Sequence, residues 1–352
     1  MYENKNFPNL FWPIILVGVG ALLLLSNLGV IDPIDANVLW QLWPVFLVIV
    51  GVNLLFGRSN RGLASLVSAV LALAIVAFLF FSPTIVDSLP TPQMQTETFD
   101  IPLEGADSAE VHLDFDRGNL TVNELSGGAN LFEAVVNHNE RVTFRASGTS
   151  QQNIRLALNN INAFRFGDLV SDQKVTGEIW LAPSVPMDLD IEIGSGSADL
   201  NLAALEITKL HANSGSGGLD IILPAGAFEA DLGSGSGSIK VETAEDSVLD
   251  LKANVGSGKI TIWVAEGNSG SLELDSGSGG ITVVVPEGMA VQVRGETGSG
   301  GVNLPREFVR TAGEDSVVGD SGTWETPGFA EAEAKLFIRF EVGSGSLRVE
   351  YP

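Results

Sequence analysis

The chain has 352 residues, a formal net charge of -24 and no cysteine. The lack of cysteine excludes disulfide bonds, zinc–thiolate sites and a cysteine nucleophile. Nucleic acid is not expected as a partner, because binding to its phosphates requires many lysines and arginines that displace counterions. The apolar residues are distributed so unevenly that two domains in different solvents are predicted, with a boundary near Ser82-Pro83.

Three apolar stretches fill the N-terminal part, at residues 10–31, 38–56 and 63–81, and none contains Asp, Glu, Lys or Arg. At about 1.5 Å per residue, each is long enough to cross a hydrocarbon core of roughly 30 Å. The sequence therefore predicts a three-helix transmembrane region at residues 1–83. Cleavage of the first stretch as a signal peptide is disfavoured, because its apolar core is too long and no A-x-A site follows.

The short polar segments before and between these stretches differ in charge. Lys5 in the N-terminal segment and Arg58 and Arg61 in the second loop carry the positive charge, whereas the loop between the first two stretches carries only the acidic Asp32 and Asp35. Positive loops remain on the cytoplasmic side of a membrane. We therefore predict a cytoplasmic N-terminus and an extracytoplasmic C-terminal domain.

The first two predicted spans repeat one motif, because Trp12-Pro13 and Trp43-Pro44 begin matching apolar runs with downstream glycine. Tandem Trp-Pro hairpins of this kind resemble the transmembrane region of LiaI/LiaF-like bacterial envelope proteins, over roughly residues 8–57. The resemblance implies a multi-pass protein of the bacterial cell membrane. Gly18, Gly20 and Gly51 either let helices approach closely or are ordinary membrane glycines.

A linker at residues 84–98 leads into sequence with period-two alternation of apolar and polar residues, as at residues 111–115 and 187–193. Such alternation is typical of half-buried strands. Residues 99–352 are therefore predicted to form an all-β extracytoplasmic domain.

A Gly-Ser-Gly-x-apolar element recurs in this domain with steps of 20 or 21 residues. Each unit reads as a strand, a Gly-Ser-Gly bend, a second strand and a turn. One unit cannot bury its own apolar face, so successive units are predicted to stack as a β-solenoid with repeats of about 21 residues. We expect the bend glycines to take positive φ and to let backbones approach, and the serine hydroxyls to bond backbone groups. The elements start at Gly194, Gly215, Gly235, Gly256, Gly277 and Gly298.

Two regions depart from the period. Residues 99–190 contain an imperfect early element, Asp116-Arg117-Gly118-Asn119-Leu120, and residues 305–335 form an acidic, irregular excursion. The pattern then resumes at Gly343-Ser344-Gly345-Ser346-Leu347. We expect both regions to cap the open strand edges of the solenoid.

The Gly-Ser-Gly solenoid resembles the bacterial toastrack-type adhesin domain. Asp116-Arg117-Gly118-Asn119-Leu120, followed by Leu131-Phe132-Glu133-Ala134, resembles the extracytoplasmic part of LiaF-like proteins. Together these resemblances cover most of residues 99–351. They imply a cell-envelope protein, in some relatives a modulator of a stress-sensing two-component system, and they carry over no catalytic residues.

Two short motifs resemble catalytic signatures without completing them. Gly256-Ser257-Gly258-Lys259-Ile260 resembles a phosphate loop, but the first glycine of a Walker A motif is replaced by Ala253 and no Ser or Thr directly follows the lysine. Gly319-Asp320-Ser321-Gly322 resembles the nucleophile segment of chymotrypsin-like proteases, but no histidine lies in that family's motif. We interpret the first as a bend and the second as a loop turn.

Metal binding is also disfavoured by spacing. His112, His138 and His211 lack the close spacing that organises a zinc site and are interpreted as surface or strand histidines. Stacked units could align acidic residues for calcium, but the calcium-binding nonapeptide is absent, so a solvated acidic face is expected. These acidic residues are Asp199, Asp220 and Asp231.

The sequence thus predicts no catalytic, cofactor-binding or metal-binding residue. The predicted protein is a non-enzymatic modulator or scaffold in cell-envelope stress sensing, with a membrane sensor kinase or another envelope protein as partner. The alternative is an adhesin-like surface module for which the helices serve only as an anchor. No small-molecule ligand is identified.

Overall fold

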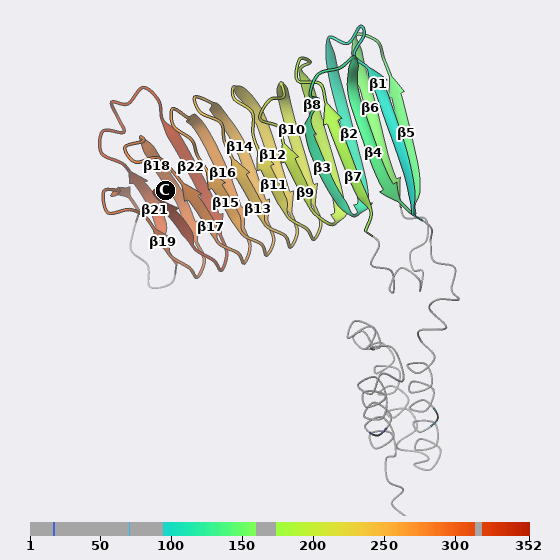
Figure 1. Ribbon diagram of the computed structural model, residues 1–352. Coiled ribbons are helices and arrows are strands. Elements are labelled where there is room, and N and C mark those ends of the chain that lie inside the picture. The colour runs from blue at the N-terminus through green and yellow to red at the C-terminus, as the bar shows by residue number, and fades with distance from the viewer. Residues whose placement is uncertain (1–16, 18–69, 71–93, 160–173, 314–318) are drawn as a thin grey trace, which may run out of the picture. The chain divides into compact units, whose positions relative to one another are not determined.

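Stacked coils of two strands each build the C-terminal domain of the computed structural model (Figure 1). The structure describes residues 94–159, 174–313 and 319–352, together with the isolated helical positions 17 and 70. The three predicted membrane spans and the first part of the predicted linker lie outside the described residues. Within the described residues, no helix is long and apolar enough to cross a membrane.

Each regular coil contains a long strand, a Gly-Ser-Gly bend and a short strand of four residues. In β10 (Ile207–Ser214) and β11 (Leu219–Ile222), buried and solvent-facing residues largely alternate, which confirms the predicted strand pattern. The apolar faces of the two strands meet inside the coil. The other regular coils are β8 (Met187–Ser195) with β9 (Ala198–Asn201), β12 (Ala227–Ser234) with β13 (Ile239–Glu242), β14 (Val248–Val255) with β15 (Ile260–Trp263), and β16 (Ser269–Ser276) with β17 (Ile281–Val284).

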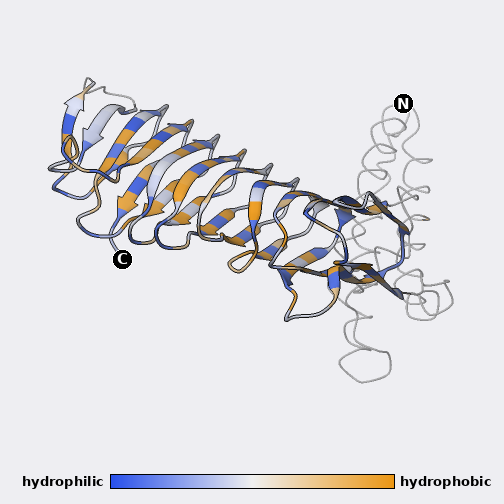
Figure 2. Ribbon diagram, turned by 90° about the horizontal axis from the view of Figure 1, so that it is seen from above, coloured by the Kyte–Doolittle hydropathy of each residue, from blue (hydrophilic) through white to orange (hydrophobic). Residues whose placement is uncertain are grey.

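The coils stack in register, so that the short strands form sheet A and the long strands form sheet B. Within sheet A, Leu219 of β11 lies between Ala198 of β9 and Ile239 of β13. Sheet A has 11 strands and sheet B has 12, and one continuous apolar core fills the space between them. Figure 2 shows the repeated alternation of apolar and polar residues along the stacked strands. The predicted all-β solenoid is confirmed.

The C-terminal coil does not occupy the end of the stack. The coil formed by β22 (Leu336–Val342) and β23 (Leu347–Glu350) lies between β16/β17 and the coil of β18 (Val291–Thr297) and β19 (Val302–Asn303), and it pairs in parallel with both neighbours. The expectation that units stack in sequence order is therefore wrong at this end. Residues 336–352 thus form the layer next to β16 and β17, in place of the coil that follows β17 in sequence.

The N-terminal end shows a corresponding insertion. The first coil, β2 (Ser108–Arg117) and β3 (Asn119–Glu124), lies between β8/β9 and a coil that follows it in sequence, β6 (Gln151–Asn159) and β7 (Thr176–Leu181). The imperfect early element at residues 116–120 thus forms a genuine bend, in which the Gly118 amide donates to the Ser195 carbonyl. Among the parallel coils of the described chain, the first and the last coil in sequence are therefore each second from an end of the stack.

Antiparallel strands flank the parallel stack at both ends. At one end, β1 (Gln95–Pro102) pairs with β4 (Asn130–His138), and β5 (Arg141–Ser147) pairs with β6. At the other end, β21 (Ser321–Glu325) joins β18, and β20 (Val309–Ala312) joins β21. The Phe99 and Phe144 rings, with centroids 4.6 Å apart, pack against the core next to the N-terminal pair of edges. These strands occupy the positions that the capping hypothesis predicts.

The bend glycines serve close backbone packing rather than positive φ. Among the glycines of the Gly-Ser-Gly elements, only Gly196 has a left-handed φ, of 136°. A Cβ placed on Gly217 would lie 1.2 Å from the Gly196 carbonyl oxygen, and one on Gly279 would lie 1.4 Å from that of Gly258. The expected positive φ is therefore wrong for the other Gly-Ser-Gly bends, while the expected close approach is confirmed.

The serine that bonds the bend backbone precedes the Gly-Ser-Gly element instead of lying within it. Ser214 Oγ accepts a hydrogen bond from the Gly217 amide at 3.0 Å, and Ser234 Oγ accepts one from the Gly237 amide at 2.9 Å. Both serines are buried, so each bond satisfies an amide at a turn that faces the core.

Candidate interaction surface

One row of outward side chains crosses sheet B with nearly alternating charge, and we call it the charge row. Parallel strands in register place equivalent positions side by side, about 4.8 Å apart, where like charges repel and opposite charges attract. The three acidic members each lie between two basic or histidine neighbours. In spatial order the charge row is Arg155, His112, Asp190, His211, Asp231, Lys252, Glu273, Arg339 and Arg294.

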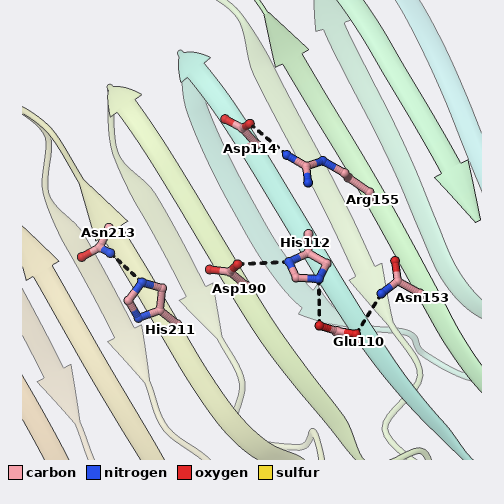
Figure 3. Close-up of polar contacts among 8 residues, drawn as sticks. All are labelled: Glu110, His112, Asp114, Asn153, Arg155, Asp190, His211 and Asn213. Carbon is pink, nitrogen blue, oxygen red and sulfur yellow. Dashed lines mark hydrogen bonds and ion pairs between the residues drawn. The ribbon is translucent and has the colours of Figure 1, made fainter.

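His112 lies between two carboxylates at the N-terminal end of the charge row (Figure 3). Its Nδ1 is 3.0 Å from Asp190 Oδ2 on β8, and its Nε2 is 3.0 Å from Glu110 Oε1 on β2. The Asn153 amide donates to the other Glu110 oxygen at 2.8 Å. Because carboxylates only accept, the ring donates to both only when both nitrogens carry protons.

The neighbouring polar contacts extend over β6 and β10. Arg155 Nη2 lies 3.7 Å from Asp114 Oδ2, and Asn213 Nδ2 lies 2.7 Å from His211 Nε2 (Figure 3). Further along, Lys252 Nζ lies 4.0 Å from Glu273 Oε2. Exposed ion pairs contribute only about 0–1 kcal/mol each. The charge row therefore sets the pattern of the surface more than the stability of the fold.

A groove of about 650 Å³ lies beside the charge row, above the bends that join sheet B to sheet A. Its walls carry Asp114, Asp116, Glu192, Asn213 and Asn254, and its floor is largely glycine backbone. Burial raises the pKa of Asp114, and the Glu192 and Asp116 carboxylates raise it further, against the opposing effect of Arg155. The groove is acidic and shallow, and its backbone is accessible where side chains are absent.

The residues of the two incomplete catalytic motifs have structural roles, as a bend and as hydrogen-bond partners of the backbone. Residues 256–259 form the bend between β14 and β15. A strand follows them, whereas a phosphate loop leads into a helix. In the second motif, Asp320 Oδ2 accepts from the Val302 amide at 3.3 Å, and its own amide donates to Thr297 Oγ1 at 2.8 Å. Asp320 and its neighbours thus tie β21 to the coil of β18 and β19.

The histidines and aspartates considered for metals are distributed over several strands. His138 is 3% exposed on β4, with Nδ1 2.9 Å from the Glu140 carbonyl, so it is a buried strand histidine. Asp199 and Asp220 are neighbours in sheet A, but Lys240 pairs with Asp220 at 3.1 Å. Across the ranges that the structure describes, no three His, Asp or Glu side chains are grouped so as to hold a metal ion.

The charge row is a feature that the sequence interpretation missed, although the sequence contains a signal for it. In each regular repeat, the row residue lies four positions before the first glycine of the bend, as Asp190 precedes Gly194 and Lys252 precedes Gly256. Comparing this position between repeats reveals the alternation. His112 likewise lies four positions before Asp116, where the imperfect early element begins, but its position between Arg155 and Asp190 depends on the out-of-order coils and could not be inferred in this way.

The fold and this surface define a class of protein: an all-β repeat protein in which the described strands present a charged outer sheet face. Residues 90–242 match the family model for the N-terminal domain of toast_rack, DUF2154, and residues 10–55 match the LiaI-LiaF-like transmembrane region. Both resemblances are thus confirmed. The chain is thus similar to the LiaI-LiaF-like transmembrane region in its N-terminal part and to the toast_rack N-terminal domain in the segment that follows.

Several solved structures are similar to this chain at low identity. A candidate cell adhesion protein from Clostridium sporogenes has 15% identity and a TM-score of 0.38, with 74% of this chain and 100% of that chain covered. A candidate adhesin from Bacteroides fragilis has 13% identity and a TM-score of 0.36, with 74% of this chain and 98% of that chain covered. A candidate lipid binding protein from Parabacteroides distasonis has 12% identity and a TM-score of 0.30, with 72% and 96% covered. No curated protein matches the chain.

Proposed function

We propose that this protein is a non-enzymatic scaffold of the bacterial cell envelope that modulates envelope stress sensing. In this proposal, the toast_rack domain binds envelope components through its open faces, and the membrane segment contacts a membrane partner such as a sensor kinase. The observation that carries the proposal is the charge row on the outer face of sheet B, in a chain whose residues 10–55 match the LiaI-LiaF-like transmembrane region.

The contacts within the charge row support binding rather than catalysis. His112 lies on the surface of a sheet and pairs with Glu110 along its own strand and with Asp190 on the neighbouring strand. The adjacent groove has a floor of glycine backbone, which offers amides and carbonyls to a ligand. Such a surface recognises a partner by its charge pattern, which determines specificity and association rate more than affinity.

The proposed arrangement divides the chain into three parts. Residues 1–83 form three membrane helices with a cytoplasmic N-terminus, residues 84–98 form the linker, and residues 99–352 form the extracytoplasmic solenoid. The repeated Trp12-Pro13 and Trp43-Pro44 spans support a specific role for the helices, because a single span is enough for anchoring. Small residues along such spans allow close contact with partner helices.

Replacement of residues 1–83 by one unrelated membrane anchor tests this proposal. The replacement anchor must give the same final orientation, and display of the solenoid is verified with an antibody. We expect the response of the deletion strain to envelope stress to remain defective, because the partner-binding helices are missing. Full complementation by the swapped protein would contradict the proposed role of the helices.

Adhesion through the solenoid alone is the alternative function. The exposed aromatic and aliphatic side chains on the outer face of sheet A favour it, since Ile222 is 41% and Trp263 is 38% exposed. In the anchor replacement, adhesion predicts unchanged binding to surfaces and an unchanged stress response. The same strain therefore distinguishes the two functions.

A further inference from the structure

The outer face of sheet A has a row of its own, in which two tryptophans flank a groove. At one end of the row, Trp180 on β7 lies beside Asn123 on β3 in register. Further along, Glu242 on β13 lies between Ile222 on β11 and Trp263 on β15. The five strand spacings from β7 to β15 correspond to about 24 Å. The side chains between the tryptophans line a groove of about 300 Å³.

The groove combines an apolar platform with hydrogen-bonding groups. Trp263 and Ile222 supply exposed apolar surface, while the polar side chains Thr121, Asn123 and Asn201 lie along the same groove. Single exposed apolar residues are common on protein surfaces. Two tryptophans on one row, with an isoleucine and amides between them, form an extended amphipathic track of the kind that marks binding sites.

The charges on the track indicate the class of ligand. Asp199, Asp220 and Glu242 line the groove, and the Lys240 ammonium is already paired with Asp220 at 3.1 Å. A polyanion such as a phosphate polymer would therefore be repelled. An uncharged ligand with alternating apolar and hydroxyl-bearing surface would not be repelled by these carboxylates.

We infer that this track binds a linear, uncharged glycan that lies across the strands of sheet A. The electron-rich face of an indole attracts the polarised C–H groups on the face of a sugar ring, and amide and carboxylate side chains bond its hydroxyls. Repeating strands about 4.8 Å apart present these groups at nearly the spacing of successive hexose units. This inference deepens the proposed binding function by assigning a ligand class to sheet A.

Titration of the full-length protein in detergent tests the inference, with cellohexaose and the hexamer of β-1,4-linked N-acetylglucosamine as probes. Binding is followed by calorimetry and by tryptophan fluorescence. We expect at least one hexamer to bind, and Trp263→Ala to weaken this binding about tenfold, as the loss of one stacked aromatic ring would. The matched control is Phe337→Ala, which removes a ring of similar exposure, 39%, from sheet B.

Trp180→Ala tests the other end of the track and is interpreted after its melting temperature has been compared with that of the parent protein, because Trp180 also packs against the core. Binding of neither hexamer, or equal weakening by Phe337→Ala and Trp263→Ala, overturns the inference. Preferential binding of a polyphosphate overturns it as well. The anchor replacement measures the stress response in cells and uses no added glycan probe, so the two proposals fail independently.

Discussion

The carbonyl oxygen of Gly237 lies where a side chain on Gly258 would begin. A Cβ built on Gly258 would be 1.6 Å from that oxygen, far inside any permitted contact. The same relationship recurs along the stack, where a Cβ on Gly345 would be 1.7 Å from the Gly279 oxygen. The second glycine of each bend is therefore required by the distance between layers, which is set by the hydrogen bonds of the sheets.

Substitution of this glycine should destabilise the solenoid even with the smallest side chain. We expect Gly258→Ala to lower the free energy of unfolding by at least about 1–3 kcal/mol, the usual cost of overpacking, and Gly258→Val by more. Thermal unfolding of the full-length protein measures the effect. Gly301→Ala is the control, because a Cβ there would have no heavy atom within 4 Å. Equal melting temperatures for the two alanine variants would show that the layers can separate without cost.

Removal of the last coil should destabilise the stack, because this coil lies between two other coils and pairs with both. Leu336, Ile338 and Leu347 are almost fully buried, and their strands join β16 and β17 to β18 and β19. We expect a chain that ends at Lys335 to lose more stability than the 2–5 kcal/mol of a single large-to-small core substitution. Limited proteolysis should then cleave within residues 285–335. Deletion of residues 351–352 alone leaves both strands complete and should have a much smaller effect.

The stability of the domain should depend on pH through Asp275. Burial raises the pKa of this side chain above 3.8, and the Glu341 and Glu273 carboxylates raise it further. The folded protein then binds the proton more tightly than the unfolded chain, so this contribution to stability is present below pH 3.8 and is lost as the pH rises through the folded pKa. Asp275→Asn should therefore raise the melting temperature near pH 7 and give no gain near pH 3. A gain that is independent of pH would contradict the electrostatic explanation.

Loss of the charge alternation in the charge row should lower the stability of the domain at low salt. Lys252→Glu places three acidic side chains in succession, between Asp231 and Glu273. We expect a cost of up to about 1 kcal/mol at low ionic strength, which decreases in 1 M salt as the screening length falls to about 3 Å. Lys259→Glu makes the same change in net charge at a bend outside the charge row. If both variants lose equal stability at every salt concentration, the alternation has no energetic role.

The predicted membrane topology can be tested by access from outside the cell. Arg58 and Arg61 should face the cytoplasm, and residues 84–352 should face outward. Protease added to intact cells or spheroplasts is expected to digest the C-terminal domain while leaving the loop with the two arginines intact. Complete protection of the solenoid would show that the orientation is reversed.

Much of the architecture follows from the sequence, because local periodicity encodes it. The Gly-Ser-Gly elements at steps of 20 or 21 residues and the alternation within strands such as β14 define which residues bend and which are buried. These signals are local: the chemistry of each residue is enough to assign its role. The spacing of repeated positions also contains the alternation of Asp190, His211 and Asp231 in the charge row.

Tertiary structure alone decided the order of the layers and the reason for the bend glycines. Parallel strands with equal apolar faces can pair with any coil of the same shape, so no local signal states that β22 inserts between β16 and β18. That insertion, and the matching one of β2, determines which charges become neighbours, including His112 and Asp190. The bend glycines likewise avoid a carbonyl of the neighbouring layer, which belongs to Gly237 for Gly258 but to the distant Gly279 for Gly345, and this close approach exists only once the coils have stacked.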